Sequence, residues 1–332
     1  MNRPVTSTDL DDARPTGPRI ALFVEDGSGD WHARRLKRAM EARGATVVTT
    51  TLSACAFDTS SPSGIEIPGF DGLLPDGAFV RSVSTGTLEQ ITFRLGILHA
   101  LRESGVRVWN DARAIERCVD KSTATFLFRK AGLPTPPTRV VEMRERAHAH
   151  LSAHPRPFVL KPLFGSQGNG VRRVRGAELL PLPEDVNNVY YMQHYLRAPD
   201  ATTFEDWRVF VSQGRVLSTM IRRGKTWLTN VHQGAEAIAH EACEEMRSLA
   251  LGALAAVGAD YAGVDVIRDE SGQLMLLEIN SNPAWKGLQA VTDVDIADVL
   301  AADFLAAVTK ASVSGLPPSR PPPQGGRRSE RA

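Results

Sequence analysis

Short apolar runs alternate with helical periodicity along residues 18–112 and predict a small α/β domain. Residues 19–24 and 45–49 are typical of strands, and residues 31–43 between them have the spacing of a helix that Gly44 ends. This strand–helix–strand order predicts parallel pairing. Two more strands follow at residues 77–81 and 106–109, joined by a helix with the apolar face Leu88, Ile91, Leu95, Leu98 and Leu101.

The rest of the chain predicts further strands and helices beyond a proline-rich junction. Residues 133–137 hold three prolines, which enforce an extended linker. Alternating apolar positions predict strands and 3.6-residue periodicity predicts helices. The predicted strands are residues 158–162, 189–196, 206–211, 216–221, 261–267 and 273–280, and the predicted helices are residues 241–257 and 296–308.

The strand at residues 273–280 ends in side chains that suit a metal ion. A carboxylate in an apolar strand must be paired or must bind a cation, so Glu278 and Asn280, with Asp265 of the preceding strand, are candidate ligands of Mg²⁺. The alternative is a solvated or salt-bridged strand end. Strict alternation places Leu274, Leu276, Glu278 and Asn280 on one face, and Met275, Leu277 and Ile279 on the other.

A glycine-rich loop between two predicted strands indicates phosphate binding. Residues 165–170 contain three glycines, which let backbone N–H groups approach an anion, and Lys161 ends the strand before them. A plain hairpin would need fewer glycines. The loop is not a P-loop, because no Gly-Lys-Ser/Thr follows and a strand, not a helix, comes next.

Other polar motifs have structural explanations beside functional ones. The turn at residues 27–29 would need a third glycine at His32 to match a dinucleotide fingerprint, so a tight turn or a substrate-contacting loop explains it better. Asp206 and Arg208 share a strand face, where the structural alternative is a surface ion pair. For Asn230 the alternative is a turn former.

Composition narrows the class of protein. The chain has 332 residues, 42% of them hydrophobic and 23% charged, and a formal net charge of +1 argues against a dedicated nucleic-acid or membrane-surface binder. No apolar run approaches about 18 residues, and the polar N-terminus does not match a signal peptide. Three widely spaced cysteines favour neither a disulfide framework nor a zinc site. We expect a cytoplasmic protein.

The order of these motifs resembles the ATP-grasp superfamily, most closely the RimK-type α-L-glutamate ligases. The resemblance covers about residues 18–310. Its matching segments are D-K at 120–121, V-L-K-P-L-F-G-S-Q-G-N-G-V at 159–171, Q-H-Y-L at 193–196, D-W-R-V-F-V at 206–211, T-N-V-H-Q-G-A at 229–235, A-G-V-D at 262–265 and E-I-N-S-N-P at 278–283.

The resemblance implies an α/β (α+β) ATP-grasp fold that holds ATP with one or two Mg²⁺ or Mn²⁺ ions. The implied units are a pre-ATP-grasp domain at 18–112, a central lid at 113–196 and a C-terminal catalytic unit at 197–312, between disordered tails at 1–17 and 313–332. The implied metal ligands are Asp265, Glu278 and Asn280, and the implied catalytic residues are Arg222, Asn230 and Arg208. The implied nucleotide-binding residues are Lys121, Lys161, Gly165, Ser166, Gln167, Gly168, Asn169, Gly170, Gln193, His194, Tyr195, Leu196 and Asp206.

The implied reaction converts a carboxylate to an acyl phosphate, which an amine attacks to form an amide. L-Glutamate is the expected amine, and the acceptor is a small cofactor-like molecule or a protein C-terminus. Residues 227–235 are similar to ligases that act on pterin-like or deazaflavin-like cofactors, whereas His194 and Gln233 depart from the RimK-type pattern. The alternatives are a kinase and a nucleotide-binding scaffold without turnover. A homo-oligomer is also expected.

Overall fold

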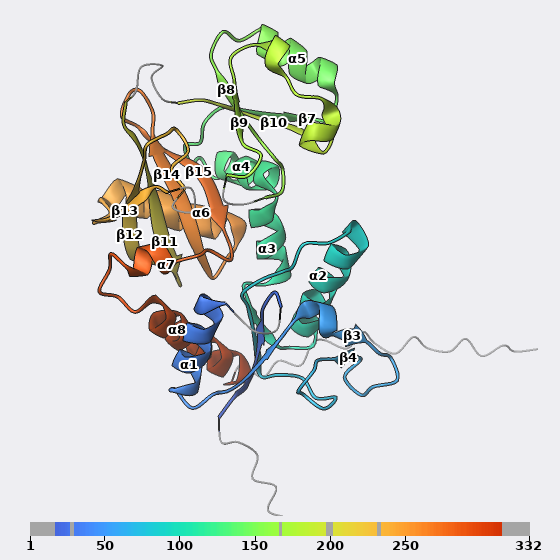
Figure 1. Cartoon of the computed structure of the whole chain (residues 1–332). Coiled ribbons are helices and arrows are strands. Elements are labelled where there is room, and N and C mark those ends of the chain that lie inside the picture. The colour runs from blue at the N-terminus through green and yellow to red at the C-terminus, as the bar shows by residue number, and fades with distance from the viewer. Residues whose placement is uncertain (1–16, 27–29, 166–167, 197–201, 231–233, 314–332) are drawn as a thin grey trace, which may run out of the picture.

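The computed structural model describes residues 17–26, 30–165, 168–196, 202–230 and 234–313. Figure 1 shows three groups of elements. The N-terminal group lies below, a small sheet within residues 138–194, called the lid here, lies above, and the C-terminal sheet lies beside both. Ser166, Gln167, Gln233, the turn at 27–29 and nearly all of the two predicted tails lie outside the described residues.

A parallel sheet with strand order β2-β1-β5-β6 forms the N-terminal group. The predicted parallel pairing is confirmed, with Arg19 opposite Thr46 and Phe23 opposite Thr50. α2 covers one face of this sheet, where its Ile97, Leu98 and Leu101 are buried. The elements are β1 (Arg19–Phe23), α1 (Trp31–Glu41), β2 (Thr46–Thr50), β3 (Ala56–Phe57), β4 (Ile65–Glu66), β5 (Gly77–Val80), α2 (Leu88–Glu103) and β6 (Arg107–Trp109).

The last helix, α8 (Ile296–Val313), returns to the start of the chain and packs beside α1 (Figure 1). Leu300 and Phe304 share one buried core with Leu22 of β1 and Phe79 of β5. Phe210 of the C-terminal sheet belongs to the same core. The two ends of the chain therefore build one hydrophobic body, while the domain boundaries inferred from the sequence stay predictions.

An antiparallel sheet with strand order β13-β12-β11-β14-β15 forms the C-terminal group. Helix α6 covers one face of it, together with α3 and α4. On the opposite face, Phe210 and Met220 belong to the core shared with the N-terminal group, as does Leu288 near the end of the chain. The elements are α3 (Ala112–Val119), α4 (Lys121–Lys130), β11 (Phe204–Ser212), β12 (Arg215–Gly224), β13 (Glu236–His240), α6 (Glu244–Val257), β14 (Tyr261–Arg268), β15 (Leu274–Asn280) and α7 (Lys286–Gln289).

The lid is a sheet of order β7-β10-β8-β9 with a hydrophobic core of its own, built from residues between Ala147 and Met192. The proline-rich linker attaches it to the C-terminal sheet, since the carbonyl of Pro134 accepts a 2.9 Å bond from the Leu276 N–H. The elements are β7 (Thr138–Val141), α5 (Arg144–Ser152), β8 (Phe158–Lys161), β9 (Arg172–Val174) and β10 (Tyr190–His194).

The mixed α/β fold class is confirmed, and each strand and helix predicted above is present within a few residues of its expected ends. None of the helices in the described part of the chain has the length and apolarity needed to cross a bilayer.

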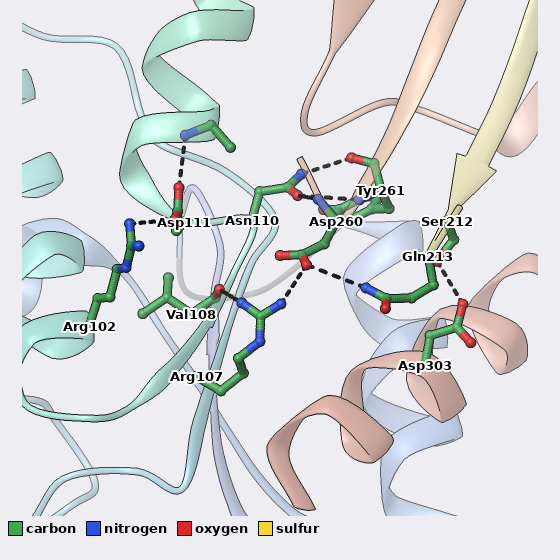
Figure 2. A network of polar contacts seen from close by, with 11 residues as sticks. Arg102, Arg107, Val108, Asn110, Asp111, Ser212, Gln213, Asp260, Tyr261 and Asp303 are labelled. Atoms are coloured by element: carbon green, nitrogen blue, oxygen red, sulfur yellow. Dashed lines mark hydrogen bonds and ion pairs between the residues drawn. The ribbon is translucent and has the colours of Figure 1, made fainter. Parts of the chain in front are cut away.

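A polar junction joins the N-terminal group to the C-terminal sheet (Figure 2). The side chain of Asn110 is fully buried and bonds four backbone groups. Its Nδ2 donates to the carbonyls of Tyr261 (2.9 Å) and Ser281 (2.7 Å), and its Oδ1 accepts from the N–H groups of Asp260 (2.6 Å) and Tyr261 (3.3 Å). Arg107 forms an ion pair with Asp260 beside it. The start of β14 and the end of β15 are thereby fixed to the chain that follows β6.

Asn110→Ala should lower the free energy of unfolding by about 2–3 kcal/mol, because several buried backbone groups lose their hydrogen-bond partner. Urea titration followed by circular dichroism measures the change. Arg102→Ala removes a neighbouring exposed arginine that binds Asp111, and it should cost no more than about 0.5 kcal/mol. Equal losses in the two variants would refute the role given to Asn110.

Candidate active site

Four charged side chains from three adjacent strands form a cluster on the face of the C-terminal sheet opposite α6. Arg222 of β12 donates to both oxygens of Asp206 on β11, each at 2.7 Å. The Nη2 atom of Arg222 also lies 2.9 Å from Oδ2 of Asp265 on β14. Arg208 donates to both oxygens of Asp265, and Thr229 donates to Asp206 at 2.7 Å. Two arginines and two aspartates thus form a closed, charge-balanced network.

Because these charged side chains are buried, each charge must be paired with an opposite charge. Asp206, Arg222 and Asp265 are each 4% exposed. Burial alone would raise the pKa of Asp265, but Arg208 and Arg222 outweigh it and the pKa is lowered. Burial likewise disfavours the charged Arg222, yet the two aspartates raise its pKa. Asp265 and Arg222 therefore stay ionised. The alternative of a surface ion pair between Asp206 and Arg208 is wrong, since each binds a residue of another strand.

A β-bulge in β15 changes which residues reach the site. The register with β14 shifts by one between Glu278 and Leu276, which leaves Leu277 as the extra residue. Leu274, Leu276 and Ile279 pack into the core against α6. Leu277 and Glu278 line the cavity on the opposite side. The predicted common face of Leu274, Leu276 and Glu278 is therefore wrong, because one inserted residue inverts the alternation of all that follow.

The candidate metal ligands lie at the end of this strand. Glu278 pairs in register with Asp265, and Asn280 Nδ2 donates to Glu278 Oε1 at 3.1 Å. In the described residues, His, Cys, Asp and Glu side chains form no group of three or more that could hold a metal ion. The oxygen atoms of Glu278 and Asn280 suit a hard cation that takes its other ligands from phosphate and water. Asp265 offers only the lone pairs that its arginine bonds leave.

Lys161 reaches the same space from the lid. It ends β8 and donates a 2.7 Å bond to Gln193 Oε1 on the neighbouring strand β10. Gln193 is 1% exposed, and its Nε2 donates to Thr138 (3.2 Å) and to the Tyr191 hydroxyl (3.3 Å). This chain of lid side chains fixes the position of the ammonium group.

The ammonium groups of Lys121 and Lys161 are held in unfavourable surroundings. Burial lowers the pKa of both lysines, and the negative charge of Glu278 offsets part of that effect. Lys121 and Lys161 also repel each other, which lowers the pKa of Lys161 further. A bound polyanion would relieve both effects, because it supplies negative charge where water has been excluded.

The glycine-rich loop carries backbone conformations that favour glycine. Gly165, Gly168 and Gly170 have φ values of +136°, +74° and +72°. A Cβ atom on Gly170 would lie 2.8 Å from Cγ of Pro162, so the loop also packs too closely for a side chain there. Lys121 at the start of α4 donates a 2.8 Å bond to the Gly165 carbonyl. The loop is thereby attached to the body of the protein.

One cavity is lined by most of the predicted site residues. It has apolar walls from Val159, Leu196, Ile267 and Leu277, which suit an aromatic base beside the β10 strand. Arg208 and Gly170 do not line it, and Asn280 lines an adjoining cavity. The predicted residues that do line it are Lys121, Lys161, Gly165, Gly168, Asn169, Gln193, His194, Tyr195, Leu196, Asp206, Arg222, Asn230, Asp265 and Glu278.

Several site residues escaped the sequence analysis. Trp227 packs edge-on against Tyr195 with ring centroids 5.9 Å apart, and Arg173 of the lid lies 5.0 Å from the Tyr195 ring. Thr229 holds Asp206, as described above. Trp227 and Thr229 lie in segments that carry the resemblance, but neither was among the implied site residues, and their contacts with Tyr195 and Asp206 follow only from the fold.

The arrangement suits phosphoryl chemistry. An apolar slot, two lysines, a glycine-rich loop and an acidic strand end meet at one place, so a nucleotide triphosphate would find a site for each of its parts. Preorganised cations next to a bound phosphate stabilise the charge that develops when its terminal group is transferred.

The sequence model of one protein family, the RimK-like ATP-grasp domain, matches residues 118–304 of this chain. Over 288 residues the chain is 33% identical to a tetrahydromethanopterin:alpha-L-glutamate ligase of Methanococcus maripaludis, with 85% of this chain and 96% of the relative covered. It is 31% identical to a probable alpha-L-glutamate ligase of Parasynechococcus marenigrum, covering 86% of this chain and 61% of that relative.

Two solved structures have a fold similar to that of this chain. The ATP-grasp ligase PsnB, complexed with a minimal precursor, has a TM-score of 0.67 at 20% identity and covers 89% of this chain and 100% of its own. D-Cycloserine synthetase DcsG has a TM-score of 0.65 at 21% identity, with 87% and 99% covered.

Lys161→Met should weaken the affinity for ATP about tenfold or more, since a charge-assisted hydrogen bond of roughly 1.5–3 kcal/mol is lost. The apo protein should not unfold more easily, because a desolvated cation is removed. Calorimetric titration with ATP and thermal melting measure the two effects. Lys130→Met, an exposed lysine at the end of α4, is the matched control and should retain wild-type affinity. Unchanged ATP affinity in Lys161→Met would exclude Lys161 from the nucleotide site.

Proposed function

Because the chain belongs to the RimK-like ATP-grasp family and is an ATP-dependent carboxylate–amine ligase, we propose that it adds L-glutamate to a carboxylate of a small, cofactor-like acceptor. The relatives named above are alpha-L-glutamate ligases, which supports glutamate as the amine. The observation that carries the proposal is the convergence of Lys121, Lys161, Arg222 and Glu278 on one cavity.

In the proposed reaction the nucleotide lies between the lid and the C-terminal sheet. Its base occupies the apolar slot beside Tyr195 and Leu196, and its phosphates lie under the glycine-rich loop with Lys121 and Lys161. The lid has a separate core and is attached through an extended linker, so it can close as a unit and exclude water from a reactive acyl phosphate.

Glu278 and Asn280, with the remaining lone pairs of Asp265, are the proposed ligands of Mg²⁺. The fit rests on the oxygen donors of Glu278 and Asn280 at the end of β15. When bound, such an ion neutralises charge on the phosphates during transfer. The number of ions and the use of Mn²⁺ stay predictions.

The proposed chemistry has two steps. A carboxylate oxygen of the acceptor attacks the terminal phosphorus of ATP, and ADP leaves. The neutral amine then attacks the carbonyl carbon, phosphate departs with the C–O electron pair, and the nitrogen releases one proton to solvent. Arg222 uses Nε and Nη2 to hold the aspartates, and its Nη1, which takes no part in those bonds, is the proposed donor to the acyl phosphate. Arg208 positions Asp265, and Asn230 lines the same cavity as Arg222.

The proposal also concerns the chemical identity of the acceptor. A relative at 33% identity is named for tetrahydromethanopterin, which supports a small cofactor over a protein C-terminus. A structural neighbour is complexed with a precursor peptide, which keeps the peptide acceptor as the second candidate. A kinase or a scaffold without turnover has no support among relatives that are named ligases. The cytoplasmic location and the homo-oligomer stay predictions.

Phosphate release should require ATP, Mg²⁺, L-glutamate and an acceptor together, and mass spectrometry should find the acceptor extended by one or more glutamyl residues. Pterin-like cofactors and C-terminal peptides are the two acceptor panels. A stable phosphorylated acceptor with no amide would instead establish a kinase.

Glu278→Gln should reduce phosphate release at saturating Mg²⁺ by roughly 100-fold or more, because the amide removes the negative charge that holds the cation. Binding of ATP in the absence of a divalent ion should change little. Glu270→Gln, an exposed glutamate in the turn before β15, is the matched control with wild-type turnover. Full activity of Glu278→Gln would contradict the metal assignment.

A further inference from the structure

Three histidine rings and one phenylalanine ring form a cluster in the lid. His150 lies in the last turn of α5, His154 follows two residues after that helix, and His194 ends β10. The ring centres of His150 and His154 are 4.3 Å apart, and those of His154 and His194 are 6.2 Å apart. The ring centre of Phe158 lies 5.3, 6.1 and 4.8 Å from those of His150, His154 and His194.

Phe158 connects the histidines to the core of the lid. It is 1% exposed, belongs to that core and pairs in register with His194 across β8 and β10, whereas the three histidines are half-buried. The N–H group of His194 donates to the carbonyl of Pro137 in the proline-rich linker at 2.9 Å. The cluster therefore lies where the lid sheet joins the linker.

The charges that act on these rings are positive. Burial lowers the pKa of His150 and of His194 from the ordinary value of 6.5. Repulsion by His154, by Arg139 of β7 and by His194 lowers the pKa of His150 further. Repulsion by His154 and by Arg156 has the same effect on His194. Both rings are therefore held neutral at neutral pH.

Acidic side chains of the surrounding elements do not offset this positive charge. Glu142 and Glu145 lie near the beginning of α5, and Glu178 lies in the turn Ala177–Leu179, which packs against α5. The cavity that His194 lines contains Glu278 and two aspartates. No acid in the described part of the chain is among the groups that act on the pKa of His150 or of His194.

The basic nitrogen of His154 follows from its hydrogen bond. Its Nδ1 donates to the carbonyl of His150 at 2.7 Å, so Nε2 is the nitrogen that can accept a further proton. A metal ion is a poor ligand for the cluster, because the described residues offer no group of three or more His, Cys, Asp or Glu side chains that could hold one. The ligand to which three histidines in contact respond is the proton.

The cluster is connected to the nucleotide cavity through β10. His194 lines that cavity, and Gln193 beside it accepts the bond that fixes the ammonium group of Lys161. Protonated histidines repel one another and require hydration, which packing on the buried Phe158 denies them. Separation of the rings would displace the end of β10, and with it a wall of the cavity and the position of Lys161.

We propose that His150, His154 and His194 form a pH-sensitive switch of the lid. While neutral, the rings pack on Phe158 and hold β10 in the position that binds ATP. Once protonated, they separate and ATP binds more weakly. The proposal goes beyond the ligase reaction and depends neither on the amine nor on the acceptor.

The direction of the response follows from proton linkage. The pKa values of His150 and His194 are lowered in the packed lid, so a lid with separated rings takes up more protons. The packed lid is therefore most favoured above pH 6.5, and it loses this advantage as the pH falls through 6.5 toward the lowered values.

The test compares ATP affinity at about pH 7.5 and about pH 5.5 in wild type and in the double variant His150→Gln/His154→Gln. Affinities at the higher pH should agree within about twofold. At the lower pH the wild type should have lost about tenfold more affinity than the double variant, within the usual range of coupling between sites. Calorimetric titration with Mg²⁺ and a non-hydrolysable ATP analogue measures both. Titration of the phosphates acts equally on the two proteins and cancels in their ratio.

Two further variants control this comparison. His148→Gln removes an exposed histidine of the same helix and should follow the wild-type pH profile. Arg156→Gln leaves all three rings in place and should weaken the pH response, because His194 loses a repelling charge. This exposed position keeps the proposal testable if the double variant does not fold, which thermal melting at both pH values shows.

NMR of the histidine rings in the full chain follows the switch directly, and His150 and His194 should titrate below pH 6.5. Parallel pH profiles of ATP affinity in wild type and the double variant would overturn the proposal. Loss of the pH response in His148→Gln would also overturn it. All of these measurements use the nucleotide alone, so failure to find glutamate ligation would leave the switch intact, and failure of the switch would leave the proposed function intact.

Discussion

The site depends on the buried charge network of Arg208, Asp265, Arg222 and Asp206. Removing charges from water costs several kcal/mol per ion, and a buried network survives only when each charge is paired in good geometry. Here the partners come from three consecutive strands, and Arg222 of β12 reaches across β11 to Asp265 of β14, so the pairing holds only if β11, β12 and β14 keep their register. Gly263 is part of the same requirement, because a Cβ atom there would lie 2.8 Å from Pro283 and 3.1 Å from the Arg208 side chain.

The lysines show the opposite arrangement, with charge left partly uncompensated. Lys121 and Lys161 have lowered pKa values because they are desolvated, and the carboxylate of Glu278 offsets this only in part. The protein therefore holds positive charge in place for a bound anion, at a cost to the stability of the empty site. The aspartate–arginine network therefore holds the strands of the site together, whereas the two lysines provide positive charge for a bound anion.

The position of the N-terminal group follows from the core that it shares with α8 and with the C-terminal sheet. This core, and the hydrogen bonds of Asn110, bring the loops after β1 and β5 against the end of β15. Arg81 and Asp30 thereby line the same cavity as Glu278. The lid has a core of its own, which leaves one wall of the nucleotide cavity able to move.

The sequence by itself predicted most of the longer strands and helices and their order, because periodicity, glycine positions and charged strand ends are local properties. It did not predict β3, β4, β7 or β13. Most of the residues that line the nucleotide cavity were implied by the resemblance to the ATP-grasp ligases. The sequence placed Lys161 before the glycine-rich loop and Glu278 at the end of its strand. It did not reveal the bulge at Leu277. An extra residue in one strand is defined only by its pairing with the neighbouring strand β14, and the alternation within a single strand does not show that pairing. Nor did it reveal that Arg208 and Arg222 share Asp265, or that Arg81 lies near Asn282, 201 positions away. Those pairings depend on which strands become neighbours, and only the packing of the whole chain decides that.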